Sequence, residues 1–176
     1  MSVERLIIKH SNDMIFASML DAGANYGFHT RAMMKNEKIR QVIAIEANPS
    51  CSQKIKNYES RFDNLTVIEK ALVAEGVKEV TFKTSQMYHG RGCIKELNIW
   101  SHYDPYIEWQ EITVDVISLD RLLSHELDNE LDYMKMGIEG AEVSILTSSC
   151  GFWETCSIAV IEHTEIGVGL AGLDGR

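Results

Sequence analysis

Short apolar segments alternate with stretches of helical spacing along most of this chain, and this alternation limits the folds it can adopt. Two apolar segments, residues 14–23 (MIFASMLDAG) and 41–50 (QVIAIEANPS), each run into a turn that carries an acid. Residues 131–136 (LDYMKM) and 156–164 (CSIAVIEHT) have the composition of two further buried strands. Strands that alternate with helices predict right-handed βαβ units. We therefore expect an α/β fold, with a mainly parallel sheet and helices on both faces.

The remaining segments predict helices between these strands and a few more strands. The expected helices are residues 28–38, 50–61, 119–127 and 139–149. Asn48 and Pro49 have the residue types of an N-cap and a first-turn proline, and Ser118 caps the helix that follows it. We expect a third strand at residues 64–73, and half-exposed antiparallel strands at 77–85 and 110–118, where polar and apolar residues alternate.

Size and charge narrow the class of protein. The chain has 176 residues and a formal net charge of −9. A chain of this size buries roughly 70% of its unfolded surface, which suits a single domain. Because an acidic chain repels phosphate backbones, nucleic acid is not an expected partner.

The cysteines and the N-terminus indicate the compartment. None of the four cysteines forms a CxxC pair, and no histidine lies at a zinc-ligand spacing from them, so we expect no metal site and buried reduced thiols. The N-terminus has no apolar core of the kind found in signal peptides. The apolar runs are shorter than the roughly 20 residues of a membrane span. These features predict a soluble cytoplasmic protein with no membrane partner.

The turn after the first strand, DAGANYG, suits a ligand that carries a positive charge. Gly23 and Gly27 permit a tight turn and close approach of a ligand to the backbone. Asp21 is poorly placed for a pyrophosphate, because like charges repel in a half-buried crevice, and well placed for an ammonium or a sulfonium. Glu46 follows at the end of the second strand, 25 residues later, about where doubly wound folds bind ribose hydroxyls with an acid.

Together, the two acids favour S-adenosylmethionine over NAD as the cofactor. The alternative is a purely structural role for both acids, in which Asp21 caps a helix and Glu46 is a solvated strand end. An NAD-dependent oxidoreductase is a weaker alternative, because the acid before the glycines counts against a pyrophosphate.

At these positions the chain resembles the FkbM family of class I methyltransferases. The matching segments occur in the family's order between about Met19 and Thr164: LDAGANYGFHT, IAIEANPS, EKALV, ITVDVISLDRLL, LDYMKMGIEGAEVSIL and IAVIEHT. The resemblance implies a Rossmann-like fold that binds S-adenosylmethionine. It also implies methyl transfer, usually to a hydroxyl oxygen of a small molecule or sugar.

The resemblance also implies roles for individual residues. Cofactor-binding positions would be Asp21, Gly23, Ala24, Asn25 and Gly27 at the methionine end, Glu46 at the ribose, and Ala47 and Asn48 on the adenosine side. We expect one methyltransferase-like domain over residues 1–176, with a cofactor half near 14–75 and an acceptor-side half near 76–176.

Two departures from the family pattern affect the expected activity. The family usually has an aspartate after the fourth strand, where this chain has Gly137. Class I methyltransferases also usually end in a strand hairpin, and the residues after Thr164 are too few for a complete one. A catalytically impaired binding module is therefore an alternative to an active enzyme. An incomplete hairpin would also leave strand edges that favour a homodimer.

Three residues are candidates for the general base. Glu139 and Glu142 lie three apart at a helix start and share one face, and Glu142 also suits the helix dipole. His163 ends the last strand, where it could accept a hydroxyl proton near neutral pH. We expect His29 to serve packing. The aromatic segment 88–109 is either an acceptor pocket or a loop packed on the sheet, and the acceptor itself cannot be identified from the sequence.

Overall fold

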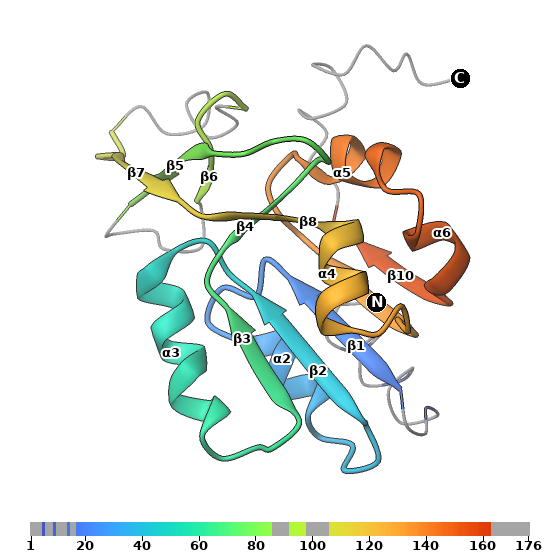
Figure 1. The fold of residues 1–176 in the computed structure, drawn as a ribbon. Coiled ribbons are helices and arrows are strands. Elements are labelled where there is room, and N and C mark those ends of the chain that lie inside the picture. Colours follow the sequence, from blue (N-terminus) through green and yellow to red (C-terminus); the bar gives the residue numbers. More distant parts are fainter. Residues whose placement is uncertain are drawn as a thin grey trace.

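The computed structural model describes residues 17–85, 92–97 and 106–162, together with Arg5, Lys9 and Met14. Its centre is a five-stranded parallel sheet in the order β10-β9-β1-β2-β3 (Figure 1). The strands are β1 (Ser18–Ala22), β2 (Gln41–Ile45), β3 (Leu65–Ile68), β9 (Tyr133–Met136) and β10 (Ile158–Ile161). The expected α/β fold with a mainly parallel sheet is confirmed.

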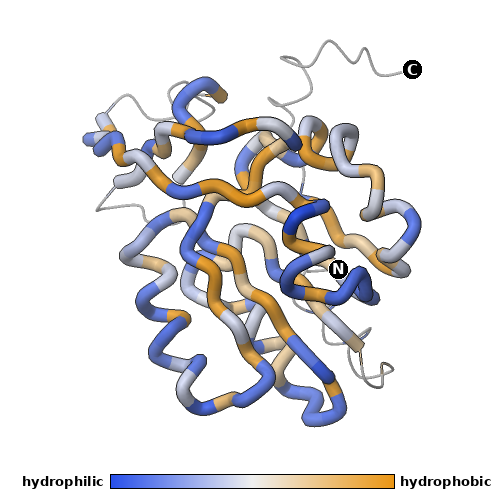
Figure 2. Tube along the Cα trace, viewed as in Figure 1, coloured by the Kyte–Doolittle hydropathy of each residue, from blue (hydrophilic) through white to orange (hydrophobic). Residues whose placement is uncertain are grey.

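Helices cover both faces of this sheet because the buried strands are apolar on both sides. Successive strand side chains point to opposite faces, so Met19 and Val42 pack with one group of helices and Leu20 and Ile43 with the other. The first face carries α2 (Phe28–Met33) and α3 (Pro49–Glu59), and the second carries α4 (Leu119–Glu126), α5 (Glu142–Ser148) and α6 (Phe152–Thr155). Figure 2 shows the apolar strands enclosed by more polar helices and turns.

Two small sheets lie beyond the ends of β2 and β3. The first pairs β4 (Ala71–Val73) with β8 (Val116–Ser118) in parallel. The second is antiparallel, with β5 (Val80–Thr84) between β6 (Cys93–Ile94) and β7 (Gln110–Val114). Buried and half-buried residues alternate along β5, as expected for a half-exposed strand.

Two segments that we expected to be single strands are each divided. Residues 64–73 form β3 and β4, because the Lys70 amide donates to the Ile68 carbonyl and turns the chain out of the main sheet. Residues 110–118 form β7 and β8, which separate at Asp115, and the carbonyl of that residue accepts from the Ala71 amide. The break therefore lets one continuous segment serve both small sheets.

The helix boundaries follow local hydrogen bonds and backbone angles. Asn48 accepts from the Ser50 amide at 3.0 Å, and Ser118 accepts from the Arg121 amide at 3.4 Å, so both expected N-caps are confirmed. The helix expected from Glu139 begins instead at Glu142. Glu139 (φ 58°) and Gly140 (φ 102°) adopt left-handed backbone conformations, which a right-handed helix cannot contain.

Some expectations concern parts of the chain that the structure does not describe, or are only partly met. The residues after Glu162, on which the expectation of an incomplete C-terminal hairpin rests, lie outside the described residues, as does most of the aromatic segment 88–109. Cys51 and Cys93 are buried, as expected of thiols in a protein core, whereas Cys150 is exposed. Within the described residues, no helix is long and apolar enough to cross a membrane.

Asp120 fastens α4 to the turn between α5 and α6. Its carboxylate accepts from the Ser149 hydroxyl, from the Cys150 amide at 3.1 Å and from the Gly151 amide at 3.2 Å. Burial pushes the pKa of Asp120 upward, but these hydrogen bonds outweigh it and the pKa is lowered overall. The native state therefore favours the ionised form of this residue.

We expect Asp120→Ala to lower the free energy of unfolding by about 1–3 kcal/mol at pH 7, because two backbone amides and a hydroxyl lose a charged acceptor. Since the folded pKa is depressed, this stabilisation is complete above the unfolded pKa of about 4 and is lost as the pH falls through the folded pKa. Urea unfolding at pH 7 and at pH 3 measures the loss of stability and its dependence on pH. The exposed Asp63→Ala is the control. An equal difference at both pH values would contradict this role.

Candidate functional site

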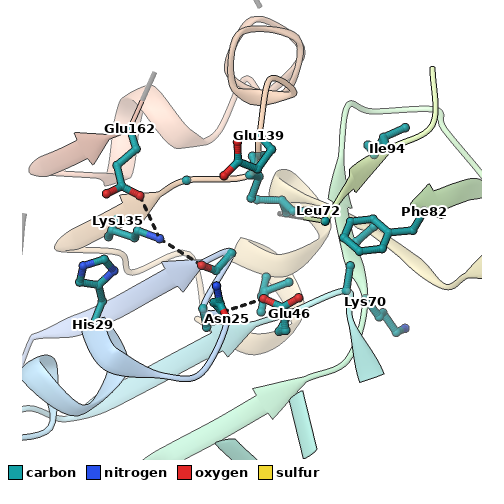
Figure 3. Close-up of a pocket in the computed structure, with 18 of the residues that line it drawn as sticks. Asn25, His29, Glu46, Lys70, Leu72, Phe82, Ile94, Lys135, Glu139 and Glu162 are labelled. Carbon is teal, nitrogen blue, oxygen red and sulfur yellow. Dashed lines mark hydrogen bonds and ion pairs between the residues drawn. The ribbon is translucent and has the colours of Figure 1, made fainter. Parts of the chain in front are cut away.

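A cavity of about 300 Å³ opens at the carboxyl end of β1, where the strand order of the main sheet reverses. β1 pairs with β2 on one side and with β9 on the other. The connections that follow these strands therefore separate at the carboxyl end of β1. Parallel α/β sheets bind ligands at such switch points. The turns after β1, β2 and β9 all contribute to the wall (Figure 3).

Two glycines set how closely the turns after β1 and β9 approach each other. Gly23 has φ +74°, and a β-carbon built on it would overlap the Gly137 carbonyl oxygen. The Gly137 amide in turn donates to the Ala22 carbonyl at 3.0 Å. No side chain other than hydrogen fits at residue 23, so the cavity floor at this point is backbone alone.

The Glu46 carboxylate connects the turns after β1 and β2. One oxygen accepts from the backbone amide of Asn25 at 2.6 Å and the other from the backbone amide of Asn48 at 2.8 Å. Glu46 is 8% exposed and lines the cavity. Burial raises its pKa, although the two backbone hydrogen bonds act in the opposite direction. Each oxygen keeps a second lone pair, so the carboxylate can still accept hydrogen bonds from a ligand.

A buried lysine of β9, one residue before the end of the strand, lines the same cavity as Glu46. The Lys135 side chain is 3% exposed, and its Nζ atom donates to the Gly23 carbonyl at 3.0 Å. The same atom lies 3.7 Å from the Asp21 carboxylate and 3.5 Å from the Glu162 carboxylate. Asp21 is fully buried and also accepts from the Thr30 hydroxyl at 2.7 Å. A buried carboxylate needs such partners, so Lys135 stabilises Asp21 in the core.

Glu142 holds the turn after β9 in shape. Its two carboxylate oxygens accept from the Ile138 amide and the Gly140 amide, each at 2.9 Å. Between these amides lies Glu139, whose φ of 58° is uncommon for a residue with a β-carbon. Such strain is often found at functional sites, and Glu139 lines the cavity.

The cavity is apolar at one side and charged at the other (Figure 3). The apolar side is lined by Leu72, Phe82 and Ile94, with Lys70 beside them, and the charged side by Lys135 and Glu162 next to His29. Asn25 and Glu46 lie between the two sides. This arrangement matches an elongated ligand with an apolar ring at one end, hydroxyl groups in the middle and charged groups at the other end.

The structure brings together part of the expected set of cofactor-binding residues and general-base candidates. The cavity wall includes Gly23, Ala24, Asn25, Glu46, Ala47 and Glu139. It does not include Asp21, Gly27, Asn48 or Glu142, which instead support the segments that form the wall. Gly27 is the N-cap of α2, with φ +74°. Asn48 caps α3, and its side-chain amide donates to the Thr84 hydroxyl at 2.7 Å. His163 lies outside the described residues.

Several cavity residues were not identified from the sequence. His29, which we expected to serve packing, faces the cavity instead, because α2 begins so close to the β1 turn that its first residues border the crevice. Lys135 had a recognisable signal, since a lysine inside an apolar strand is seldom buried without a partner. Phe82 and Ile94 had no recognisable signal in the sequence. They come from β5 and β6 of a small sheet, whose position the hydrophobic pattern does not predict.

Comparison with known families decides the class of protein. Residues 21–169 match the Methyltransferase FkbM domain, which is most of the chain. The chain belongs to the FkbM methyltransferase family. The resemblance seen in the sequence is thereby confirmed, and the family match supports a methyltransferase rather than the oxidoreductase alternative.

Solved structures show the same fold. A methyltransferase FkbM from Methylobacillus flagellatus KT is similar, with a TM-score of 0.58 and 18% identity over 89% of this chain and 35% of that chain. A precorrin-6y C5,15-methyltransferase from Geobacter metallireducens GS-15 matches 96% of this chain and 66% of its own, with a TM-score of 0.51 and 13% identity. No curated protein matches the chain by sequence. The chain thus spans 35% of the length of its FkbM structural neighbour.

Proposed function

We propose that this FkbM domain binds S-adenosylmethionine and transfers its methyl group to a hydroxyl oxygen of a small molecule or sugar. The observation that carries the proposal is the Glu46 carboxylate, held by two backbone amides at the centre of a cavity that is apolar at one side and charged at the other. The cofactor has the same order of parts: a purine, a ribose with two hydroxyls, and a charged amino acid with a sulfonium.

The residues present fit this cofactor. The purine would lie against Leu72, Phe82 and Ile94, where burial of an apolar ring is favourable. The ribose hydroxyls would donate to Glu46, and the methionine part would lie over the backbone at Gly23 and Asn25. A β-carbon on Gly23 would overlap the Gly137 carbonyl oxygen, so the turns after β1 and β9 can approach this closely only because residue 23 has no side chain.

Bound S-adenosylmethionine supplies an activated methyl group, so the protein's main task is to bring donor and acceptor into line. Good positioning contributes roughly 7–11 kcal/mol, and a general base about 3–5 kcal/mol. Glu139 is the best-placed base among the described candidates, because it lines the cavity on a strained turn. Glu142 is less suited, since both its oxygens hold backbone amides. His163 remains a candidate in this proposal.

Two measurements test this function. Calorimetric titration with S-adenosylhomocysteine should show one binding site, and NADH should show none. Incubation with methyl-labelled S-adenosylmethionine and a panel of sugars and small alcohols should then label an acceptor. No binding of S-adenosylhomocysteine would refute the cofactor proposal. Binding without labelling of any acceptor would instead favour the impaired binding module.

Cofactor binding should weaken at acid pH. The pKa of Glu46 is raised by burial, so this carboxylate takes up a proton at a higher pH than an exposed glutamate does. Ribose hydroxyls bind the ionised form better, and protonation therefore competes with binding. We expect the affinity for S-adenosylhomocysteine to be constant above the raised pKa and to fall as the pH drops through it. Titrations between pH 4.5 and 8 check this, and an affinity that is flat over this range would contradict the role of Glu46.

A further inference from the structure

One ammonium group serves two carboxylates at the charged side of the cavity. Lys135 Nζ lies 3.7 Å from Asp21 and 3.5 Å from Glu162, so this trio carries one surplus negative charge. Asp21 is fully buried, and among the described residues its Oδ1 atom receives no hydrogen bond. Asp21 therefore depends on the lysine most strongly, because an uncompensated buried charge is costly.

Glu162 is the member of this trio that is most open to a ligand. Its side chain is 44% exposed and lines the cavity, whereas Lys135 is 3% exposed. The surplus charge thus lies on the cavity wall, and Glu139 adds a second carboxylate to that wall. A cationic group on a bound ligand would offset this charge.

The carboxylate of Glu162 occupies the space that a side chain at residue 137 would fill. A β-carbon built on Gly137 would overlap the Glu162 Oε2 atom, and would lie 3.1 Å from Lys135 Nζ and 3.3 Å from the β-carbon of Glu162. Gly137 therefore lets an acid from the end of β10 reach across to the end of β9. The acid at this corner of the site comes from the neighbouring strand.

We propose that Glu162 forms an anionic subsite that receives a cationic group of the cofactor, and that Gly137 is required for its position. The proposal rests on the function proposed above and names the residue that recognises charge. S-adenosylmethionine has two cationic groups, the sulfonium and the amino acid's ammonium, and either can meet this carboxylate. Lys135 is a positioning residue, since it holds Glu162 in place and neutralises Asp21.

Three ligands that differ in charge test the subsite by calorimetry. S-adenosylmethionine has a sulfonium and an ammonium, S-adenosylhomocysteine has only the ammonium, and methylthioadenosine has neither. We expect Glu162→Gln to weaken S-adenosylmethionine about three- to tenfold and to leave methylthioadenosine unchanged. An equal loss for S-adenosylhomocysteine assigns the subsite to the ammonium, and a loss for S-adenosylmethionine alone assigns it to the sulfonium.

Two further variants make the test specific. Glu154→Gln removes the same charge at an exposed residue of α6 and should leave all three affinities unchanged. Gly137→Ala keeps the charge but displaces the carboxylate, and should reproduce the charge-dependent loss. The subsite is refuted if Glu162→Gln weakens all three ligands equally or none of them, while the native chain binds. A native chain that binds none of the three would refute the proposed function and the subsite with it.

Discussion

Glu46→Ala is expected to lower the affinity for S-adenosylhomocysteine by at least about 100-fold. Each hydroxyl that donates to a carboxylate contributes roughly 1.5–3 kcal/mol, and the variant removes the acceptor of both ribose hydroxyls. It also leaves the Asn25 and Asn48 amides without the carboxylate that joins the two turns. Calorimetry measures the affinity, and circular dichroism and thermal unfolding establish that the variant is folded.

A matched control separates ligand binding from the loss of backbone hydrogen bonds. The Glu59 carboxylate also accepts from a backbone amide, that of Val67 at 2.8 Å, but it does not line the cavity. Glu59→Ala should therefore destabilise the fold slightly and leave the affinity of the cofactor unchanged. An affinity in Glu46→Ala within threefold of the native value would contradict the ribose role of Glu46.

Gly23→Ala is expected to have the largest effect on stability. The residue has φ +74°, which costs a side chain about 1–2 kcal/mol, and its β-carbon would overlap the Gly137 carbonyl. Because this neighbour is backbone, one of the two turns must move, and we expect a total loss of about 3 kcal/mol or more. A loss of this size lowers the melting temperature of a domain of this length by about 6–12 °C. Differential scanning calorimetry measures it.

Gly76→Ala is the matched control for backbone strain. Gly76 has φ +85°, and a β-carbon there would have no atom within 4 Å, so the variant pays only the conformational cost. The difference between the two variants isolates the contact between the turns after β1 and β9. Equal destabilisation in Gly23→Ala and Gly76→Ala would show that this close approach is absent.

The order of strands and helices could be predicted because each element carries a local signal. Both faces of β1, β2 and β9 are buried, so these strands read as mainly apolar runs. Asn48 and Ser118 mark helix starts by their side-chain caps. The divisions at Lys70 and Asp115 could not be predicted. The break at Lys70 is a local turn in which its amide donates to the Ile68 carbonyl, whereas the break at Asp115 depends on the distant Ala71 amide. The composition at each break is ordinary.

The site was predictable where the sheet topology fixes it and not where distant elements meet. Gly23, Asn25, Glu46 and Glu139 follow strand ends, and the carboxyl edge of a parallel sheet brings them together. The direct role expected for Asp21 was harder to judge, because strand direction does not tell whether a carboxylate points into a crevice or into the core. Only the contacts with Thr30 and Lys135 place it in the core.

Gly137 shows how a side chain from another strand can change the interpretation of a position. In the sequence it marks an absent acid and suggests an impaired site. In the structure the Glu162 carboxylate lies where a side chain at residue 137 would begin, so the corner is acidic after all. An aspartate at this position, as in Gly137→Asp, would bring two carboxylates into contact.

The structure of the complex with S-adenosylhomocysteine tests the central claim most directly. The account predicts both ribose hydroxyls within hydrogen-bond distance of the Glu46 carboxylate, the purine against Phe82 and Ile94, and the amino-acid end beside Gly23 and Glu162. A ligand bound in the reverse direction, or with its ribose away from Glu46, would contradict it.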